Sequence, residues 1–255
     1  MVIAHLIAAI WLSADGTPLP FHSSDEVVSW LQEAEVVHVD EKRLGGVTNA
    51  RKVVVERDGI RVHAVFRAVD EIHRNTRWDN GLYTPWLRDS YKNELAAYEL
   101  SRLLGLETIP PTVPWKLRRR RGAVQLWIEN AETGYRDDET RRPADPEAWL
   151  KERATMRAFD ALIENVDRNA GNMLIDPNGR VWWIDHTRSF GRGRELYGAE
   201  AIARCSRRFY EALKAVDPQL IEQRLSPYLG GFEIKALLDR RDKLLALIEK
   251  RVTLF

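Results

Sequence analysis

The sequence predicts an α+β protein in two parts, a sheet-rich part with one main helix followed by a helix-rich part. Before residue 130, residues 60–69 alternate between apolar and polar, as in a half-buried β-strand, and residues 52–56 are rich in valine. After residue 145, apolar residues recur at the spacing of a helix face. A charged, irregular stretch lies between these patterns. We therefore expect one part to span residues 1–130 and the other to span residues 131–255.

The composition is that of a globular protein. The chain has 255 residues, of which 44% are hydrophobic and 30% are charged, so it can bury a core without a disulfide or metal staple. Cys205 is the only cysteine, which excludes an internal disulfide and a multi-thiolate zinc site. Basic residues number 39 and acidic residues 38. This balance gives no overall attraction to nucleic acid, and we expect no nucleic-acid partner.

The N-terminal segment is apolar. Residues 2–12 are interrupted only by His5, and this run is too short to cross a bilayer. We expect a buried segment in a cytoplasmic protein. The alternative is a signal peptide cleaved near Ser13, which would make the protein secreted, although no Lys or Arg precedes the apolar run. No other segment resembles a membrane span.

Local signals place the elements of the first part. Ser23 and Ser24 precede a helix of about ten residues, since both can act as N-caps, and Asp58-Gly59 predicts a hairpin turn. Gly105 ends the main helix, expected over residues 91–104. Residues 70–87 contain turn-forming residues and read as a long irregular insertion. The expected strands are 36–39, 52–56, 60–69, 112–117 and 123–128.

The second part opens with Asp145-Pro146, an N-cap followed by a proline suited to the first helical turn. That helix should end near Glu164. Two short strands should then form a hairpin around a turn at residues 177–179. The expected strands are 173–175 and 181–184, and further helices are expected over about 197–214, 217–226 and 232–251.

Three polar residues around this hairpin predict a site for Mg²⁺. Asp167 lies at the exit of an apolar helix, and Asn172 follows five residues later, just before the first strand. Asp185 ends the second strand. Since a tight hairpin brings its ends together, the oxygens of Asn172 and Asp185 should converge, and hard oxygen ligands suit Mg²⁺. Asp167 would then orient or deprotonate a nucleophile.

This segment resembles the atypical branch of the protein-kinase superfamily: the phosphatidylinositol 3-/4-kinases, the HipA-like kinases and the Golgi casein kinase family. The similarity covers roughly residues 40–190, and the specific part is residues 159–190. The corresponding motifs here are a catalytic loop, 165–172, and a metal motif, 184–187. The whole chain is also similar to bacterial proteins of this type. The resemblance implies a two-lobed kinase-like fold with a sheet-rich N-lobe and a helix-rich C-lobe, ATP and Mg²⁺ as cofactors, and a hydroxyl acceptor.

The resemblance also implies counterparts in the first part. Gly45, Gly46 and Thr48 lie in a loop that would cover nucleotide phosphates with backbone N–H groups. Arg67 stands where such kinases carry a strand lysine, and Glu94 on the following helix would pair with it. The hinge, residues 127–130 with Glu129, would meet adenine.

The sequence departs from the family pattern at three positions, which leaves alternatives open. Arg67 replaces a lysine, Asn169 stands where a histidine is usual, and Thr187 stands where a glycine is usual. We expect an ATP- and Mg²⁺-dependent phosphotransferase that acts on a protein, lipid or sugar hydroxyl. The alternatives are a pseudokinase that binds nucleotide without turnover and an enzyme that transfers AMP on the same fold.

Two other features have a plain interpretation and a functional one. Lys52 is read as an exposed strand lysine, with a replacement for the missing lysine as the alternative. The run Arg118-Arg119-Arg120-Arg121 is read as a solvated turn, with phosphate binding as the alternative.

Overall fold

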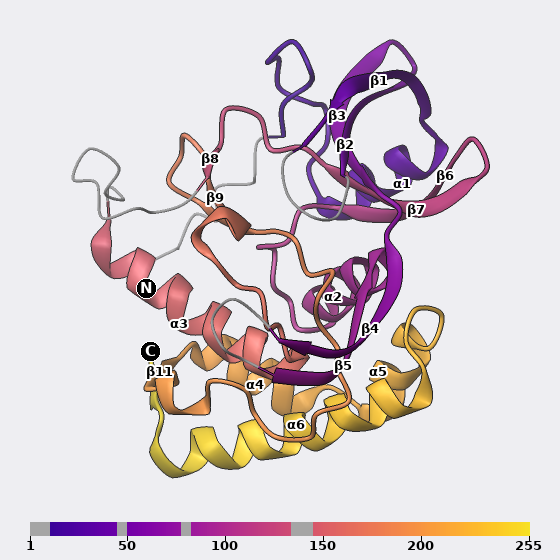
Figure 1. The fold of residues 1–255 in the computed structure, drawn as a ribbon. Coiled ribbons are helices and arrows are strands. Elements are labelled where there is room, and N and C mark those ends of the chain that lie inside the picture. The colour runs from indigo at the N-terminus through magenta and orange to yellow at the C-terminus, as the bar shows by residue number, and fades with distance from the viewer. Residues whose placement is uncertain (1–10, 45–49, 78–82, 134–144) are drawn as a thin grey trace. The chain divides into compact units, whose positions relative to one another are not determined.

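The computed structural model describes residues 11–44, 50–77, 83–133 and 145–255. Contacts within the chain divide it into two compact units. The sheet unit comprises Met1–Ala68 and Pro110–Asn130, and the helical unit comprises Val69–Ile109 and Ala131–Phe255. The ribbon shows their elements (Figure 1).

The sheet unit contains a five-stranded antiparallel sheet in the order β1-β2-β3-β7-β6, with helix α1 beside it. Asp58 and Gly59 turn β2 into β3, and both have positive φ, 52° and 75°, as a two-residue type I′ hairpin requires. β6 and β7 likewise form a hairpin. The elements are α1 (Ser24–Glu33), β1 (Glu35–Arg43), β2 (Arg51–Arg57), β3 (Ile60–Arg67), β6 (Thr112–Leu117) and β7 (Arg120–Leu126).

The alternation expected over 60–69 appears only in the first half of β3, because the residues from Ala64 to Arg67 are all buried. In β2 the side chains of Val53 and Val55 are fully buried while their neighbours are partly exposed. Ser23 caps α1 by accepting a hydrogen bond from the backbone N–H of Glu26. The helix packs on β6 and β2 through a face that includes Trp30. The core of this unit therefore lies between α1 and the sheet.

The helical unit contains five α-helices among its described residues, together with short strands. α3 packs against α6, and α2 packs against α5. The helices are α2 (Tyr91–Leu103), α3 (Pro146–Ile163), α4 (Arg207–Ala215), α5 (Pro218–Leu225) and α6 (Gly231–Arg251). The strands are β4 (Asp70–Arg77), β5 (Tyr83–Ser90), β8 (Glu132–Thr133), β9 (Met173–Ile175), β10 (Val181–Trp183), β11 (Arg204–Cys205) and β12 (Thr253–Leu254).

The long helix α3 begins and ends as its sequence indicates. The carboxylate of Asp145 accepts hydrogen bonds from the backbone N–H groups of Glu147 and Ala148, both at 3.0 Å, and Pro146 is the first helical residue. Glu164 ends the helix in the left-handed conformation, with φ of 53°. Arg240 of α6 is fully buried and donates to the Leu162 carbonyl and to Glu164. This contact ties α6 to the end of α3, directly before the candidate catalytic loop.

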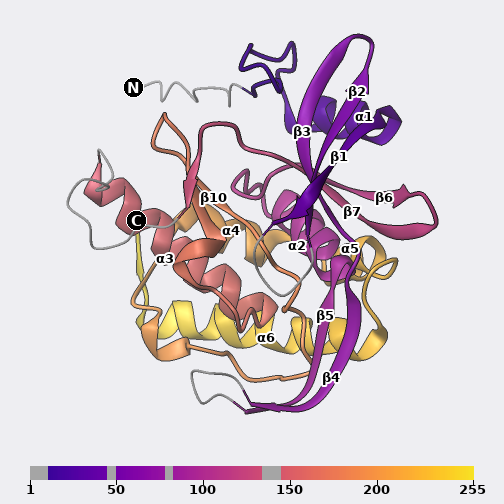
Figure 2. The same ribbon diagram turned by 45° about the horizontal axis from the view of Figure 1, so that its top comes forward.

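Within the expected irregular insertion, the described residues 70–77 and 83–87 are regular strands. They belong to an antiparallel hairpin of β4 and β5, paired from Asp70 with Ser90 to Arg77 with Tyr83, and Figure 2 shows it as a long two-stranded ribbon. The β4 side chains are exposed or partly exposed throughout, so the sequence lacks the apolar alternation that reveals a half-buried strand.

The helix expected over 197–214 starts only at Arg207. Before it, the chain forms a 3₁₀ turn, Ala199–Ala201, and the strand β11, which pairs in parallel with the C-terminal strand β12. Ser206 then caps α4. The pairing partner of β11 lies almost 50 residues away in the sequence, so no local pattern could reveal this strand.

The grouping of the elements differs from the expected division at residue 130, because residues 69–109 belong with the helical unit. Helix α2 contacts α5, and its buried Asn93 donates hydrogen bonds to the carbonyls of Thr187 and Ser189. Among the described residues, no helix is both long and apolar enough to cross a membrane. Most of the apolar N-terminal run, residues 2–10, lies outside the described part of the chain.

Candidate functional site

The hairpin of β9 and β10 brings two of the predicted site residues together. Trp183 is paired with Met173, so the residues just outside the hairpin, Asn172 and Ile184, are also neighbours. The backbone N–H of Ile184 donates to the carbonyl of Asn172 at 3.2 Å. Asp185 follows Ile184 directly. The structure therefore places Asn172 beside Ile184 at the open end of the hairpin, one residue before Asp185.

Asp167 joins this pair through the amide of Asn172. The Nδ2 group of Asn172 donates to the backbone carbonyl of Asp167 at 2.8 Å, and Asn169 donates to the same oxygen at 3.2 Å. Since the amide nitrogen of Asn172 is used in this way, its Oδ1 atom is the one left to meet a ligand. The three predicted residues thus lie in one cluster within the helical unit.

Arg168 holds this cluster together. Its guanidinium group binds both carboxylate oxygens of Asp160, at 2.9 and 3.0 Å. It also donates to the carbonyls of Asn172 and Ile184, at 2.6 and 2.9 Å. Arg168 and Asp160 are almost fully buried. Arg168 therefore braces the loop from behind.

His186 and Glu94 form a second buried support. Both side chains are fully buried, and Glu94 accepts the backbone N–H of His186 at 2.7 Å. Arg168 also contacts Nε2 of His186 at 2.9 Å. Since an arginine can only donate, Nε2 must accept, so the ring proton lies on Nδ1, which faces Glu94 at 3.4 Å. Glu94 from α2 thereby fixes the residue that follows Asp185.

The side chain of Asp167 is held by a residue that sequence reasoning missed. Arg188 donates to Asp167 at 3.1 Å and to the buried Asp89 at 2.8 Å. Burial raises the pKa of Asp167, Arg188 lowers it, and the nearby charge of Asp185 raises it again, with a net increase. A carboxylate with a raised pKa is a stronger base. Arg188 lies three residues beyond Asp185, outside the metal motif 184–187, and Asp89 lies 99 residues before Arg188 in the sequence.

Asp185 has an unusual backbone conformation. Its φ is 57°, in the left-handed region that most residues avoid. Its carboxylate accepts a hydrogen bond from the hydroxyl of Thr187 at 3.1 Å. Thr187 stands where the kinases that this segment resembles carry a glycine. Here its hydroxyl orients the carboxylate of Asp185. Strained backbone of this kind is concentrated at functional sites.

In the sheet unit, Arg67 is a buried cation with few partners. Only 6% of its surface is exposed, and its one hydrogen bond within the described residues is long, 3.4 Å to the neutral Gln125. Its Nε atom is buried without a partner in that same part of the chain. Gly122 lies directly against β3 at Arg67. A Cβ atom added at position 122 would lie 2.2 Å from the backbone carbonyl oxygen of Arg67, so a larger residue would not fit.

The expected hinge has partners of its own. Glu129 binds His63 at 2.6 Å, so its carboxylate is occupied. Lys52 lies over the ring of Trp127, with 4.5 Å between Nζ and the ring centre, and is not a free strand lysine. Gly45, Gly46 and Thr48 lie outside the described residues. Arg118 to Arg121 are exposed in and beside a tight turn, in agreement with a solvated run.

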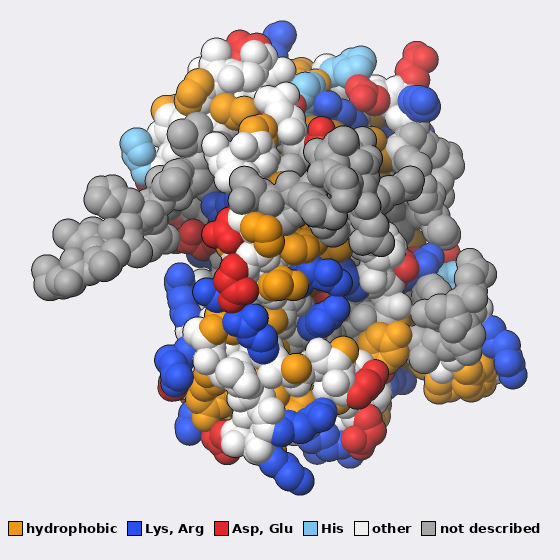
Figure 3. All heavy atoms as spheres, turned by 90° about the vertical axis from the view of Figure 1, so that its left-hand side faces the viewer, with side chains coloured by type: hydrophobic (Ala, Val, Ile, Leu, Met, Phe, Trp, Pro, Cys, Tyr) orange, Lys and Arg blue, Asp and Glu red, His pale blue; other side chains and the backbone are white. Residues whose placement is uncertain are grey.

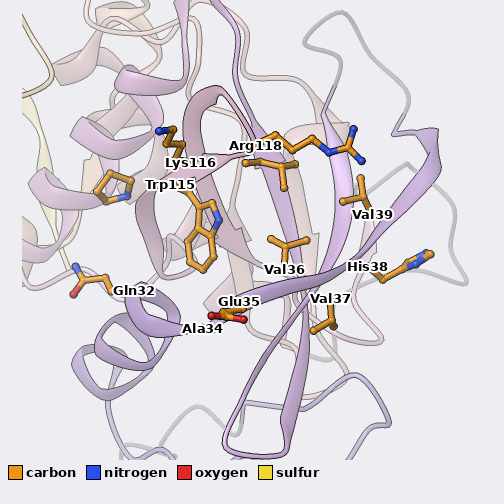
Figure 4. A pocket seen from close by; sticks show the side chains of 12 residues that line it. Gln32, Ala34, Glu35, Val36, Val37, His38, Val39, Trp115, Lys116 and Arg118 are labelled. Atoms are coloured by element: carbon orange, nitrogen blue, oxygen red, sulfur yellow. The ribbon is translucent and has the colours of Figure 1, made fainter.

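Each unit contains a cavity or groove. In the helical unit, a cavity of about 480 Å³ adjoins the catalytic loop at Asn169 and Ala170. In the sheet unit, a groove of about 760 Å³ lies between the two edge strands β1 and β6. Figure 4 shows Trp115 on one side of this groove and Val36 and Val39 on the other. None of the predicted site residues that the structure describes lines it.

Comparison with known proteins supports the architecture. No protein-family model matches the sequence, and no curated protein matches it. Among solved structures, the chain is similar to hydra Fam20, determined with a sugar, with a TM-score of 0.61 and 19% identity over 91% of both chains. It is also similar to the Helicobacter pylori proinflammatory kinase CtkA, with a TM-score of 0.51 and 12% identity over 84% of this chain and 97% of that one. These similarities show that the chain has a kinase-like fold, with one sheet-rich and one helix-rich part.

Proposed function

We propose that this chain transfers the γ-phosphoryl group of ATP to a hydroxyl acceptor with the help of Mg²⁺, as an enzyme of the atypical kinase branch. The observation that carries the proposal is the cluster of Asp167, Asn172 and Asp185, which Arg168 braces from behind. A kinase-like fold supplies the context in which such a cluster performs phosphoryl transfer.

The residues present fit Mg²⁺. This ion prefers oxygen ligands and is usually held by one or two carboxylates together with water and substrate phosphates. Asp185 supplies a carboxylate that Thr187 orients. Asn172 supplies its Oδ1 atom, because its Nδ2 group is already bound to the carbonyl of Asp167. When bound, the ion would neutralise charge on the phosphates of ATP.

Arg67 fits the role of a phosphate-binding residue. A buried cation with an unpartnered Nε atom is costly to the fold unless an anion pairs with it. Arginine can bind phosphate with two parallel hydrogen bonds. We assign the α- and β-phosphates to Arg67 and the covering loop to Gly45, Gly46 and Thr48. Glu94 supports the metal motif through His186, and adenine would meet the backbone of the hinge near Glu129.

Asp167 would act as the base. As the acceptor oxygen forms its bond to the γ-phosphorus, its proton passes to the carboxylate of Asp167, and the bond between the γ-phosphorus and the bridging oxygen breaks. Arg188, anchored on Asp89, would hold that carboxylate in position. Positioning and charge neutralisation provide most of the catalysis in such reactions.

A thermal-shift titration with ATP, with and without Mg²⁺, tests the nucleotide site. Ligand at 100 times its Kd stabilises the folded state by about 2.7 kcal/mol, so the wild type should melt at a higher temperature when both are present. Asp185→Asn should lose the Mg²⁺-dependent part of this shift. Asparagine tolerates the left-handed backbone of Asp185 better than alanine does. Asp242→Asn, an exposed site on α6, is the matched control.

Turnover distinguishes the proposal from its rivals. Asp167→Asn should lower the rate of ATP-dependent acceptor modification by about 10²–10⁴-fold while ATP still binds. Mass spectrometry of the product should show an added phosphoryl group. An added AMP would establish the transferase alternative, and binding without any product would establish the pseudokinase. Absence of an ATP-dependent shift in the wild type would rule out the proposed nucleotide site.

A further inference from the structure

The cavity beside the catalytic loop has a composition suited to a ligand. Its volume of about 480 Å³ lies in the range of small-molecule sites. Side chains of α3 line one part of it, and Asn169 and Ala170 of the loop line another, together with Tyr197, Gly198 and Ala201. All of these residues belong to the helical unit.

Two arginines in this cavity have no acidic partner in the described part of the chain. Arg153 and Arg157 lie four residues apart on α3 and therefore on one face of the helix. Neither makes an ion pair with any residue that the structure describes. The one acidic residue lining the cavity, Asp160, is already bound to Arg168. The cavity thus presents a net positive charge that the described residues do not neutralise.

The rest of the lining is largely apolar. Trp149, Met156 and Met173 are each more than 90% buried, while Tyr197 is 40% exposed. The guanidinium of Arg153 lies 5.7 Å from the ring of Trp149. On the face shown in Figure 3, Lys and Arg side chains are numerous in the lower half of the view. An apolar floor with cations beside it suits a ligand that carries both a ring and an anionic group.

We propose that this cavity binds a small anionic molecule with an apolar ring, held by Arg153 and Arg157, and that this molecule is the hydroxyl acceptor. The second half rests on the proposed function. The link to the reaction is the cavity wall: Asn169 lines it and donates to the backbone carbonyl of Asp167 at 3.2 Å. The acceptor would then be a phosphate- or carboxylate-bearing small molecule.

Isothermal titration of the full chain with phenyl phosphate tests the cavity. Inorganic phosphate tests the anion without the ring, and benzyl alcohol tests the ring without the anion. Phenyl phosphate should bind most tightly. Arg153→Gln and Arg157→Gln should each weaken it by about tenfold or more, because each removes charge-assisted hydrogen bonds. Lys151→Gln is the matched control, since Lys151 lies on the same helix, does not line the cavity and pairs with Glu147.

The proposal fails if the double variant Arg153→Gln/Arg157→Gln binds phenyl phosphate as tightly as the wild type. It also fails if inorganic phosphate binds equally well to the wild type, since the apolar floor would then have no role. Glutamine suits a helix interior, and a melting curve for each variant shows that weakened binding is not lost folding.

An experiment with a paramagnetic metal ion distinguishes failure of this proposal from failure of the proposed function. Mn²⁺ bound at Asn172 and Asp185 should broaden the proton NMR signals of bound phenyl phosphate. The electron paramagnetic resonance spectrum of Mn²⁺ reports separately whether the ion binds. Binding of phenyl phosphate without binding of Mn²⁺ would retain the anion site and overturn the phosphotransferase. Bound Mn²⁺ that leaves the signals of bound phenyl phosphate sharp would retain the metal site and overturn the assignment of this cavity to the acceptor.

Discussion

Arg67 in the sheet unit and Arg168 in the helical unit are both buried arginines, but their surroundings differ in kind. Arg168 binds a carboxylate with two hydrogen bonds and also reaches two backbone carbonyls and a histidine nitrogen. Arg67 makes a single long hydrogen bond to a neutral amide within the described residues, and its Nε atom has no partner there.

This difference separates a structural cation from one suited to a ligand. A buried charge is tolerated when it is paired and fully hydrogen-bonded, and it is costly otherwise. Arg168 satisfies that condition inside its own unit, so its role is to hold the loop. Arg67 does not satisfy it, so an anion from outside the fold would stabilise it. The comparison predicts that the two residues respond in opposite ways to substitution.

The largest effect is expected for Arg168→Gln. The substitution leaves Asp160 as a buried charge without its partner, which typically costs about 3–5 kcal/mol. The free energy of unfolding, measured by urea denaturation, should fall by this amount. Lys243→Gln removes an exposed ion pair with Glu195 and should cost less than about 1 kcal/mol. Equal losses in the two variants would contradict the role given to Arg168.

Arg67→Met should instead leave the stability of the ligand-free protein unchanged or raise it, because it replaces a poorly paired buried charge with an apolar side chain of similar length. ATP affinity should fall by about tenfold or more, or 1.4 kcal/mol. Calorimetric titration and urea denaturation of the same variant provide both quantities. A loss of stability as large as that of Arg168→Gln, with ATP affinity intact, would show that the two arginines do not differ.

A smaller effect is expected at Asp70, where the β4–β5 hairpin meets α2. Burial alone would raise the pKa of this carboxyl, but hydrogen bonds from Lys92, Ser90 and Arg88 outweigh it and lower the pKa below the ordinary value of 3.8. A carboxyl whose pKa is lower in the folded state contributes stability above its unfolded pKa. That contribution should disappear as the pH falls below 3.8 and through the folded pKa.

The test compares the urea unfolding of the wild type and Asp70→Asn on both sides of pH 3.8. The two proteins should differ above that pH and converge below it. Asp58→Asn, at an exposed turn, is the surface control measured alongside. A difference between wild type and Asp70→Asn that stays constant across the range would contradict the assigned pKa direction.

Much of the fold follows from local sequence signals. The Asp58-Gly59 turn and the Asp145-Pro146 helix start lie where their residues indicate, because turns and caps depend on a few adjacent residues. The β4–β5 hairpin was missed because a ribbon exposed along its length needs no apolar alternation. β11 was missed because its partner strand is the distant C-terminus.

The candidate site divides in the same way. The spacing of Asp167, Asn172 and Asp185 around a short hairpin was sufficient to expect them in one cluster, since the hairpin itself is local. The residues that hold the cluster come from elsewhere in the chain: Asp89 lies about a hundred residues before Arg188, and Glu94 lies 92 residues before His186.

The sequence by itself therefore determined the order of most elements, the two-part character of the fold and the three residues of the cluster, because periodicity, caps and short turns are set by neighbouring residues. The tertiary structure alone decided which charges are paired. Ion pairs such as that of Arg188 with Asp89 join residues distant in sequence, and burial depends on the packing of whole elements. For this reason the sequence does not distinguish the fully hydrogen-bonded Arg168 from the poorly paired Arg67. Their hydrogen-bond partners differ only in the folded chain.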